Sequence, residues 1–351
     1  MRSLYDEYGK RYPELCFDLL CFFCDTAKES EWIKRFKVKA SPTLIKCVMD
    51  FVDAYKDIYK TREGHMIQPK DVALICKKLA EFNYLSAITF GSINNHDGSF
   101  DSYSAGFGRL EKLKPLKDVM IRKLNGIVYG KKYIYENNKQ NVLPIFVEGK
   151  LDKKTGKYDN KQYVGSCVRT MNGIVTAKHC IDGYKEVAIK GMSAEELRDT
   201  AILTRGDMDL VLIVPKDYAK SVKGILSLPM ISDGEVLDKI MVMGYPSHGG
   251  FDNFITTTSG EIAAIENCYI YKHELMLLTC ATKGGNSGGP VFNACGEIVG
   301  IVTETSIAEG DNYDDFGYGI AVPSKYISEI ARSNEEFIHK INFIDSPGEA
   351  Q

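Results

Sequence analysis

The sequence predicts a chain of two parts, a small all-α region followed by an all-β barrel or sandwich. Apolar residues recur every three or four positions from Pro13 to about Tyr84, which is the period of amphipathic helices. Beyond Gly126 the pattern changes to short β-branched and aromatic runs separated by turns. A length of 351 residues is enough for two domains with a sizeable buried core.

The N-terminal region is expected to form a small helical bundle. Its run 16–24 is apolar nearly all round, which predicts the most buried helix. Further helices are expected over about 42–58, where Ser41 and Pro42 mark the start, over 69–82, and from Pro115 to a stop at Gly126. Residues 91–109 are crowded with Gly, Ser, Asn and Asp, which is typical of a loop or hinge.

The remainder of the chain contains strand patterns. They are expected at 142–147, 163–168, 173–177, 187–189, 210–214, 240–243 and 255–258. We therefore divide the chain into a helical domain over 1–125, a β domain over 126–341 that ends in a helix, and a C-terminal tail over 342–351.

Charge and hydropathy exclude several classes of function. A net charge of −3 with scattered Lys and Arg gives no basic surface for nucleic acid. No stretch is long and apolar enough to cross a bilayer, so no membrane partner is expected. The chain shows no motif for a metal or another cofactor, and we expect none.

The ten cysteines are interpreted as buried thiols of a cytoplasmic protein. The N-terminal cysteines at 16, 21 and 24 could be imagined as metal ligands, but their spacing fits no zinc pattern. The run from Leu15 to Cys24 is interrupted by Asp18 and followed by no small-residue cleavage site, so it is expected to be a helix rather than a signal peptide.

One glycine-rich stretch indicates the chemistry. Residues 283–290 read Lys-Gly-Gly-Asn-Ser-Gly-Gly-Pro, with four glycines around Ser287. Glycines permit sharp turns, so such a loop can expose a hydroxyl and aim several backbone N–H groups at one point. A serine attacks a carbonyl when a base takes its proton and fixed donors receive the developing negative charge. We interpret Ser287 as a nucleophile, with the N–H groups of Gly285 and Ser287 as oxyanion donors; a hairpin with an incidental serine is the alternative.

The segment 285–290 resembles the nucleophile loop of the trypsin-like, chymotrypsin-fold serine proteases. The resemblance implies a double six-stranded barrel over 126–341 and a catalytic triad. Residues 174–180, Ile-Val-Thr-Ala-Lys-His-Cys, resemble the segment that carries the general base, which is then His179. Asp209 opens an aliphatic run that resembles the family's aspartate strand. Asp207 is the competitor, but choosing it would put a charge where the pattern has a small buried residue.

Two further stretches, 243–246 and 317–324, resemble their counterparts in HtrA-type and V8-type bacterial proteases, and no PDZ-like pattern follows Pro323. Asn286 stands where animal trypsins carry an aspartate that pairs with a newly cut N-terminus, so activation by that route is not expected. Cys180 follows the histidine as in secreted relatives, where its disulfide partner is expected at the position of Val164.

The resemblance also implies where a substrate would bind. Ala281 occupies the place of the aspartate at the floor of the trypsin pocket, with Thr282 beside it. Thr303, Glu304 and Thr305 should line the substrate backbone and the pocket wall. We expect small or aliphatic residues at the cleavage position, with a basic preference through Glu304 as the alternative.

The sequence therefore predicts an intracellular serine endopeptidase that acts on protein or peptide substrates. Its helical N-terminal domain is expected to bind a protein partner or to restrain the active site. Two other functions are alternatives, a catalytically silent binding or scaffold protein and a viral-type protease that processes its own polyprotein.

Overall fold

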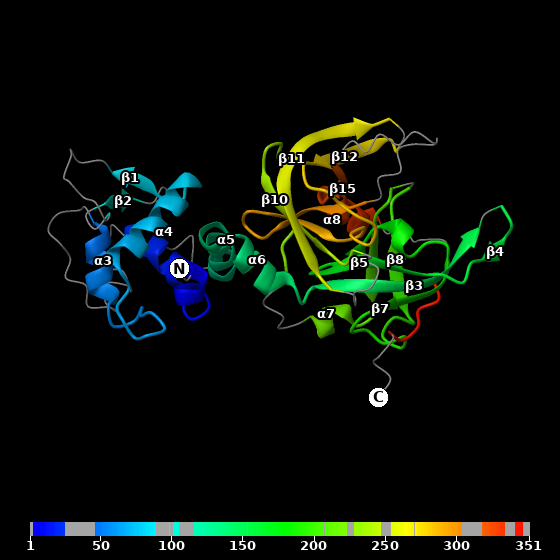
Figure 1. Ribbon diagram of the computed structural model, residues 1–351, viewed down its shortest axis with the longest axis horizontal. Coiled ribbons are helices and arrows are strands. Elements are labelled where there is room, and N and C mark those ends of the chain that lie inside the picture. Colours follow the sequence, from blue (N-terminus) through cyan, green and yellow to red (C-terminus); the bar gives the residue numbers. More distant parts are fainter. Residues whose placement is uncertain are drawn as a thin grey trace. The chain divides into compact units, whose positions relative to one another are not determined.

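The computed structural model describes residues 3–24, 46–88, 98, 101–104, 116–152, 154–206, 208–222, 228–246, 254–269, 271–303, 318–333 and 341–346. The chain forms two compact units, Met1–Ile134 and Tyr135–Gln351 (Figure 1). The division falls inside helix α6 (Lys131–Asn138), later in the chain than the expected boundary at 125/126.

The N-terminal unit is built from helices, as its periodicity predicts. They are η1 (Tyr5–Gly9), α1 (Leu15–Cys24), α3 (Val48–Tyr55), α4 (Pro69–Glu81) and α5 (Lys117–Tyr129). All ten residues of α1 are buried, including Asp18, whose carboxylate accepts a hydrogen bond from the Tyr59 hydroxyl. The rings of Phe51, Tyr55 and Tyr59 stack nearby. The cysteines of α1 therefore belong to an aromatic and aliphatic core.

Some local expectations for this unit need correction. Helix α5 does not stop at Gly126, which is buried inside it; it ends at Gly130, whose φ of 65° suits the left-handed region open to glycine. Two short strands pair with each other, β1 (Ser86–Ile88) just before the segment 91–109 expected to be a loop and β2 (Ser102–Ser104) inside it. The expected helix start at Ser41 and Pro42 lies outside the described residues.

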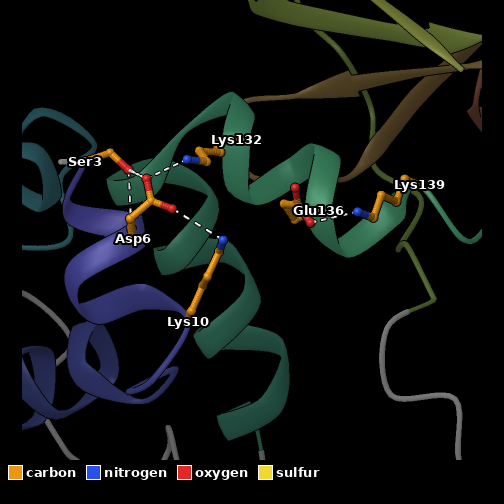
Figure 2. A network of polar contacts seen from close by, with 6 residues as sticks. All are labelled: Ser3, Asp6, Lys10, Lys132, Glu136 and Lys139. Atoms are coloured by element: carbon orange, nitrogen blue, oxygen red, sulfur yellow. Dashed lines mark hydrogen bonds and ion pairs between the residues drawn. The ribbon is translucent and has the colours of Figure 1, made fainter. Parts of the chain in front are cut away.

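A cluster of ion pairs fixes the first turn of the chain to the start of α6. Asp6 on η1 contacts the Lys132 ammonium at 2.5 Å and the Lys10 ammonium at 3.3 Å, and it accepts a hydrogen bond from the Ser3 hydroxyl at 2.8 Å (Figure 2). These contacts, chiefly the one with Lys132, hold the pKa of Asp6 below its ordinary value.

The second half of the β unit is a closed barrel. Its strands are β10 (Lys239–Gly244), β11 (Thr256–Cys268), β12 (His273–Leu278), β15 (Gly319–Pro323), β14 (Ile298–Val302) and β13 (Pro290–Asn293), each paired with the next and β13 with β10. Its interior is aliphatic, with Ile240, Ile262 and Val299 among the residues packed inside. Closure leaves this barrel without an edge strand.

The first half of the β unit is a curved sheet that does not close on itself. It contains β3 (Val142–Asp152), β4 (Lys157–Tyr158), β5 (Gln162–Thr170), β6 (Gly173–Thr176), β7 (Tyr184–Ile189), β8 (Thr200–Leu203) and β9 (Val211–Pro215). Along the path β7, β3, β5, β6, β9, β8, the strands β7 and β8 form the two edges. A closed barrel beside this curved sheet fits the predicted double-barrel fold, and the fold class is confirmed.

The C-terminal part packs on the β unit. Helix α8 (Lys325–Ser333) forms as expected, and its Glu329 carboxylate pairs with the Arg205 guanidinium. Residues 341–346 do not form the separate tail that was expected. They lie along β7, where Phe343 and Val187 form a parallel bridge.

Candidate active site

The loop that carries Ser287 joins β12 to β13 and needs glycine at particular points. Gly285 and Gly288 have φ values of 95° and 82°, which side chains rarely adopt. A Cβ at Gly288 would lie 2.0 Å from the carbonyl oxygen of Ser166 and 2.2 Å from Oγ1 of Thr176. The glycines therefore let the loop lie directly against β5 and β6.

Ser166, a fully buried residue of β5, fixes this loop from the other half of the β unit. Its N–H donates to the Ser287 carbonyl oxygen at 2.8 Å, and its hydroxyl donates to the Gly285 carbonyl oxygen at 2.7 Å. The same hydroxyl oxygen accepts the Tyr245 N–H at 2.9 Å. Sequence reasoning missed this residue, because a lone serine inside a strand gives no signal of a distant partner.

His179 and Asp209 meet as the sequence predicts. The imidazole lies on the short 3₁₀ turn η4 (Lys178–Cys180) just after β6, and Asp209 lies just before β9. Nδ1 of His179 is 2.6 Å from Oδ2 of Asp209, and the His179 backbone N–H donates to Oδ1 at 2.8 Å. The competing Asp207 lies outside the described residues.

The environment shifts the pKa of both partners. Burial alone would lower the pKa of His179 and raise that of Asp209. Other contacts outweigh burial: those with Asp209 and the Cys180 thiol act on His179, and those with His179 and the Thr303 hydroxyl act on Asp209. They raise the pKa of His179 above its ordinary 6.5 and hold that of Asp209 below 3.8. Thr303, whose hydroxyl donates to Oδ2 of Asp209, adds to the stabilisation of the carboxylate.

Ser287 contacts Cys180, the residue next to His179, through its backbone carbonyl oxygen. The Cys180 thiol lies 3.8 Å from Nε2 of His179 and donates to the Ser287 carbonyl oxygen at 3.3 Å. Within the described ranges, the Ser287 hydroxyl makes no hydrogen bond with the imidazole. Catalytic hydrogen bonds of this kind are often long without substrate and tighten in the complex.

Two amides of the loop are left available. The N–H groups of Asn286, Gly288 and Gly289 donate to backbone carbonyl oxygens at 2.7–2.9 Å. Those of Gly285 and Ser287 donate to no acceptor among the residues that the structure describes. These are the two amides that the sequence predicts as oxyanion donors.

The expected substrate-binding residues divide into three groups. Ala281 is exposed and Thr282 half-buried. Gly319 lies opposite, since a Cβ there would come within 2.7 Å of Cγ2 of Thr282. Thr303 is buried, and its hydroxyl donates to the Asp209 carboxylate. Glu304 and Thr305 are outside the described residues.

Comparison with known proteins agrees with this geometry. Residues 164–301 match the family model described as a trypsin-like peptidase domain. This part of the chain is therefore similar to trypsin-like peptidase domains. The predicted resemblance to HtrA-type members of that class is confirmed by its relatives.

Among the relatives of the peptidase domain are three named proteases. The chain is 26% identical over 173 residues to protease Do-like 2, chloroplastic, of Arabidopsis thaliana, covering 46% of this chain and 27% of that protein. It is 32% identical over 158 residues to the putative serine protease HhoA of Synechocystis sp., covering 43% and 37%. It is 27% identical over 188 residues to the serine protease Do-like HtrA of Bacillus subtilis, covering 52% and 38%. The chain thus spans less than half the length of these relatives.

Among solved structures, the chain is similar to an HtrA-type protease, AlgW with tripeptide. The TM-score is 0.41 at 20% sequence identity, covering 57% of this chain and 62% of the other.

The position expected to face Cys180, the cysteine next to His179, needs a correction. Gly165, not Val164, faces Cys180, since a Cβ at Gly165 would lie 2.9 Å from the Cys180 sulfur. Side chains alternate between the two faces of a strand, so the expected position was wrong by one residue on β5. No disulfide joins any of the ten cysteines, all of which are described.

No group of three or more His, Cys, Asp and Glu side chains is arranged to hold a metal ion within the described ranges. Across the same ranges, none of the helices has the length and apolarity needed to span a membrane.

Proposed function

We propose that this chain is a serine endopeptidase that cleaves protein substrates through Ser287, His179 and Asp209. The observation that supports it most is the 2.6 Å contact between His179 and Asp209, beside a serine loop whose Gly285 and Ser287 amides have no acceptor among the described residues. Relatives named as serine proteases add support.

The reaction proceeds in two halves. Nε2 of His179 takes the Ser287 proton as Oγ attacks the substrate carbonyl carbon, and the same imidazole then gives that proton to the leaving amine. Water hydrolyses the resulting acyl-enzyme by the reverse sequence. Asp209 holds the proton on Nδ1 and stabilises the imidazolium, while the Gly285 and Ser287 amides receive the oxyanion. Each such donor is worth about 3 kcal/mol of the activation barrier.

We propose a cleavage preference from the residues expected to bind the substrate side chain. Ala281 supplies no charge and Thr282 beside it is uncharged and half-buried, which favours a small or aliphatic side chain. A peptide library should therefore show alanine, valine or leucine before the cut bond. A profile dominated by Glu or Asp would contradict this preference.

The test of turnover compares the parent with Ser287→Ala and with Ser193→Ala, a surface control outside the site. Cleavage products from a complex protein mixture are identified by mass spectrometry. The parent and Ser193→Ala should give the same cuts, and Ser287→Ala none. Equal cutting by Ser287→Ala would reject Ser287 as nucleophile, and no cutting by the parent would favour the silent binding protein.

We further propose that the N-terminal unit restrains or targets the peptidase domain. Its support is a separate compact unit with an aromatic core of its own. A cleavage site engineered at the exposed Lys139 and Gln140 allows the full chain to be cut between the units after purification. The rate should change several-fold on cutting; an unchanged rate, with and without cell extract, would contradict restraint.

We also propose a cytoplasmic, reducing location, supported by ten cysteines without a disulfide. Alkylation in denaturant, as the protein is extracted from its own cells, should modify all ten thiols. Protection of any pair until reductant is added would contradict this location.

A further inference from the structure

The edge of β7 is occupied by a segment from the far end of the chain. On one side β7 pairs with β3 at five residue positions. On its other side the Val187 N–H donates to the Asn342 carbonyl oxygen at 3.0 Å, and the Ile344 N–H donates to the Val187 carbonyl oxygen at 2.9 Å. This is the hydrogen-bond pattern of a parallel strand added to a sheet edge.

The first three side chains of the added segment alternate between the core and solvent. Ile341 and Phe343 pack against the core of the first sheet, while Asn342 and Asp345 are exposed. Asp345 accepts the Ala194 N–H at 2.8 Å, which fixes the end of the segment. Ser346 is buried. The recognised pattern is therefore an apolar residue, an asparagine that donates to the Lys185 carbonyl oxygen, a second apolar residue, and an acidic residue two positions further on.

The added segment is attached by fewer main-chain contacts than the strands of the first sheet. One bridge and two main-chain hydrogen bonds attach residues 341–346, whereas every other neighbour in the first sheet is paired over two to seven positions. In the second barrel, residues 230–232 attach to Ile298 of β14 in the same way, by one parallel bridge and two main-chain hydrogen bonds.

We propose that the β7 edge is a docking site for an extended peptide and that residues 341–346 of the same chain are its occupant. The main chain of Val187 supplies the attachment, the core of the first sheet takes the apolar side chains, and the Ala194 N–H selects the acidic residue. The site is distinct from the proposed active site, and its occupancy requires no turnover.

The test uses the full chain and a fluorescent peptide with the sequence of residues 341–346. Ile344→Pro removes the N–H that binds the Val187 carbonyl oxygen and empties the edge, whereas Ile344→Val retains it and is the matched control. The peptide should bind Ile344→Pro at least tenfold more tightly than it binds the parent or Ile344→Val. The Val187 amide should exchange with deuterium at least tenfold faster in Ile344→Pro, and added peptide should restore its protection.

Several outcomes would overturn the proposal. It fails if a folded Ile344→Pro protein does not bind the peptide, or if a peptide with proline in place of Ile344 binds equally well. A parent dimer that Ile344→Pro dissociates would show that a second copy supplies the segment. If Ile344→Pro does not fold, Asp345→Ala takes its place: peptide binding no tighter than to the parent would then overturn the proposal. None of these readouts depends on Ser287, so they separate this proposal from the proposed function.

Discussion

The two halves of the β unit differ in how they are closed. The second barrel is closed by its own six strands, and it carries the glycine-rich loop of Ser287. The first sheet has two edges, carries His179 and Asp209 at its rim, and has residues 341–346 along one edge. The comparison teaches that the proposed nucleophile is carried by a barrel that closes by itself, yet its loop is fixed by Ser166 of the first sheet, which also carries the base.

The largest expected effect on activity is at the rim of the first sheet. Asp209→Asn preserves the size of the side chain but cannot hold the His179 proton on Nδ1. We expect kcat to fall about 10⁴-fold. Steady-state kinetics on a peptide substrate measures the loss, with Asp199→Asn, a change away from this contact, as control. A fall of less than tenfold would mean that Asp209 does not orient the base.

In the loop that carries Ser287, a steric clash should lower the stability of the fold. Gly288→Ala places a Cβ against the Ser166 carbonyl oxygen at a φ of 82°. We expect the free energy of unfolding in urea to fall by about 3 kcal/mol. Gly284→Ala in the same loop is the control, because a Cβ there meets nothing within 4 Å. Equal stability of the two variants would contradict the close contact between the loop and β5.

Thr303 connects the two halves through Asp209, and its removal should have an intermediate effect. Thr303→Val loses a hydrogen bond to a charged carboxylate, for which we expect kcat to fall about tenfold. Thr303→Ser retains the hydroxyl and should keep most of the activity. If the valine and serine variants have the same kcat, the hydroxyl has no part in positioning Asp209.

The smallest expected effect is a shift in the pH dependence of kcat/KM. His179 must be neutral to accept the Ser287 proton, so kcat/KM should rise with pH through its pKa, which lies above 6.5. Asp209→Asn removes the charge that raises this pKa while burial remains, so the residual activity should rise at lower pH. A parent profile with its midpoint below 6 would contradict the pair geometry.

The same pKa shifts of His179 and Asp209 predict how the stability of the fold changes with pH. The raised pKa of His179 contributes stability that is present below pH 6.5 and lost as pH rises through the folded-state value. The lowered pKa of Asp209 contributes stability that is present above 3.8 and lost as pH falls through its folded-state value. The pair should therefore stabilise the fold most between these limits.

The sequence could predict what depends on local pattern. Helical periodicity placed α1 and α4, and the glycines around Ser287 indicated a loop that can turn tightly. Gly126 was a misleading stop signal, because helix packing can bury a glycine and the positive φ at Gly130 ended the helix instead. The contacts of Ser166, Thr303 and residues 341–346 join segments far apart in the chain. No spacing in the sequence encodes such pairings.

The central claim is that Ser287 is a nucleophile activated by the His179 and Asp209 pair. Incubation of the full chain with a fluorophosphonate, followed by peptide mass spectrometry, tests it most directly. The account predicts one covalent adduct on Ser287 that is absent in Ser287→Ala and forms far more slowly in Asp209→Asn. An unmodified parent, or an adduct on a different serine, would contradict it.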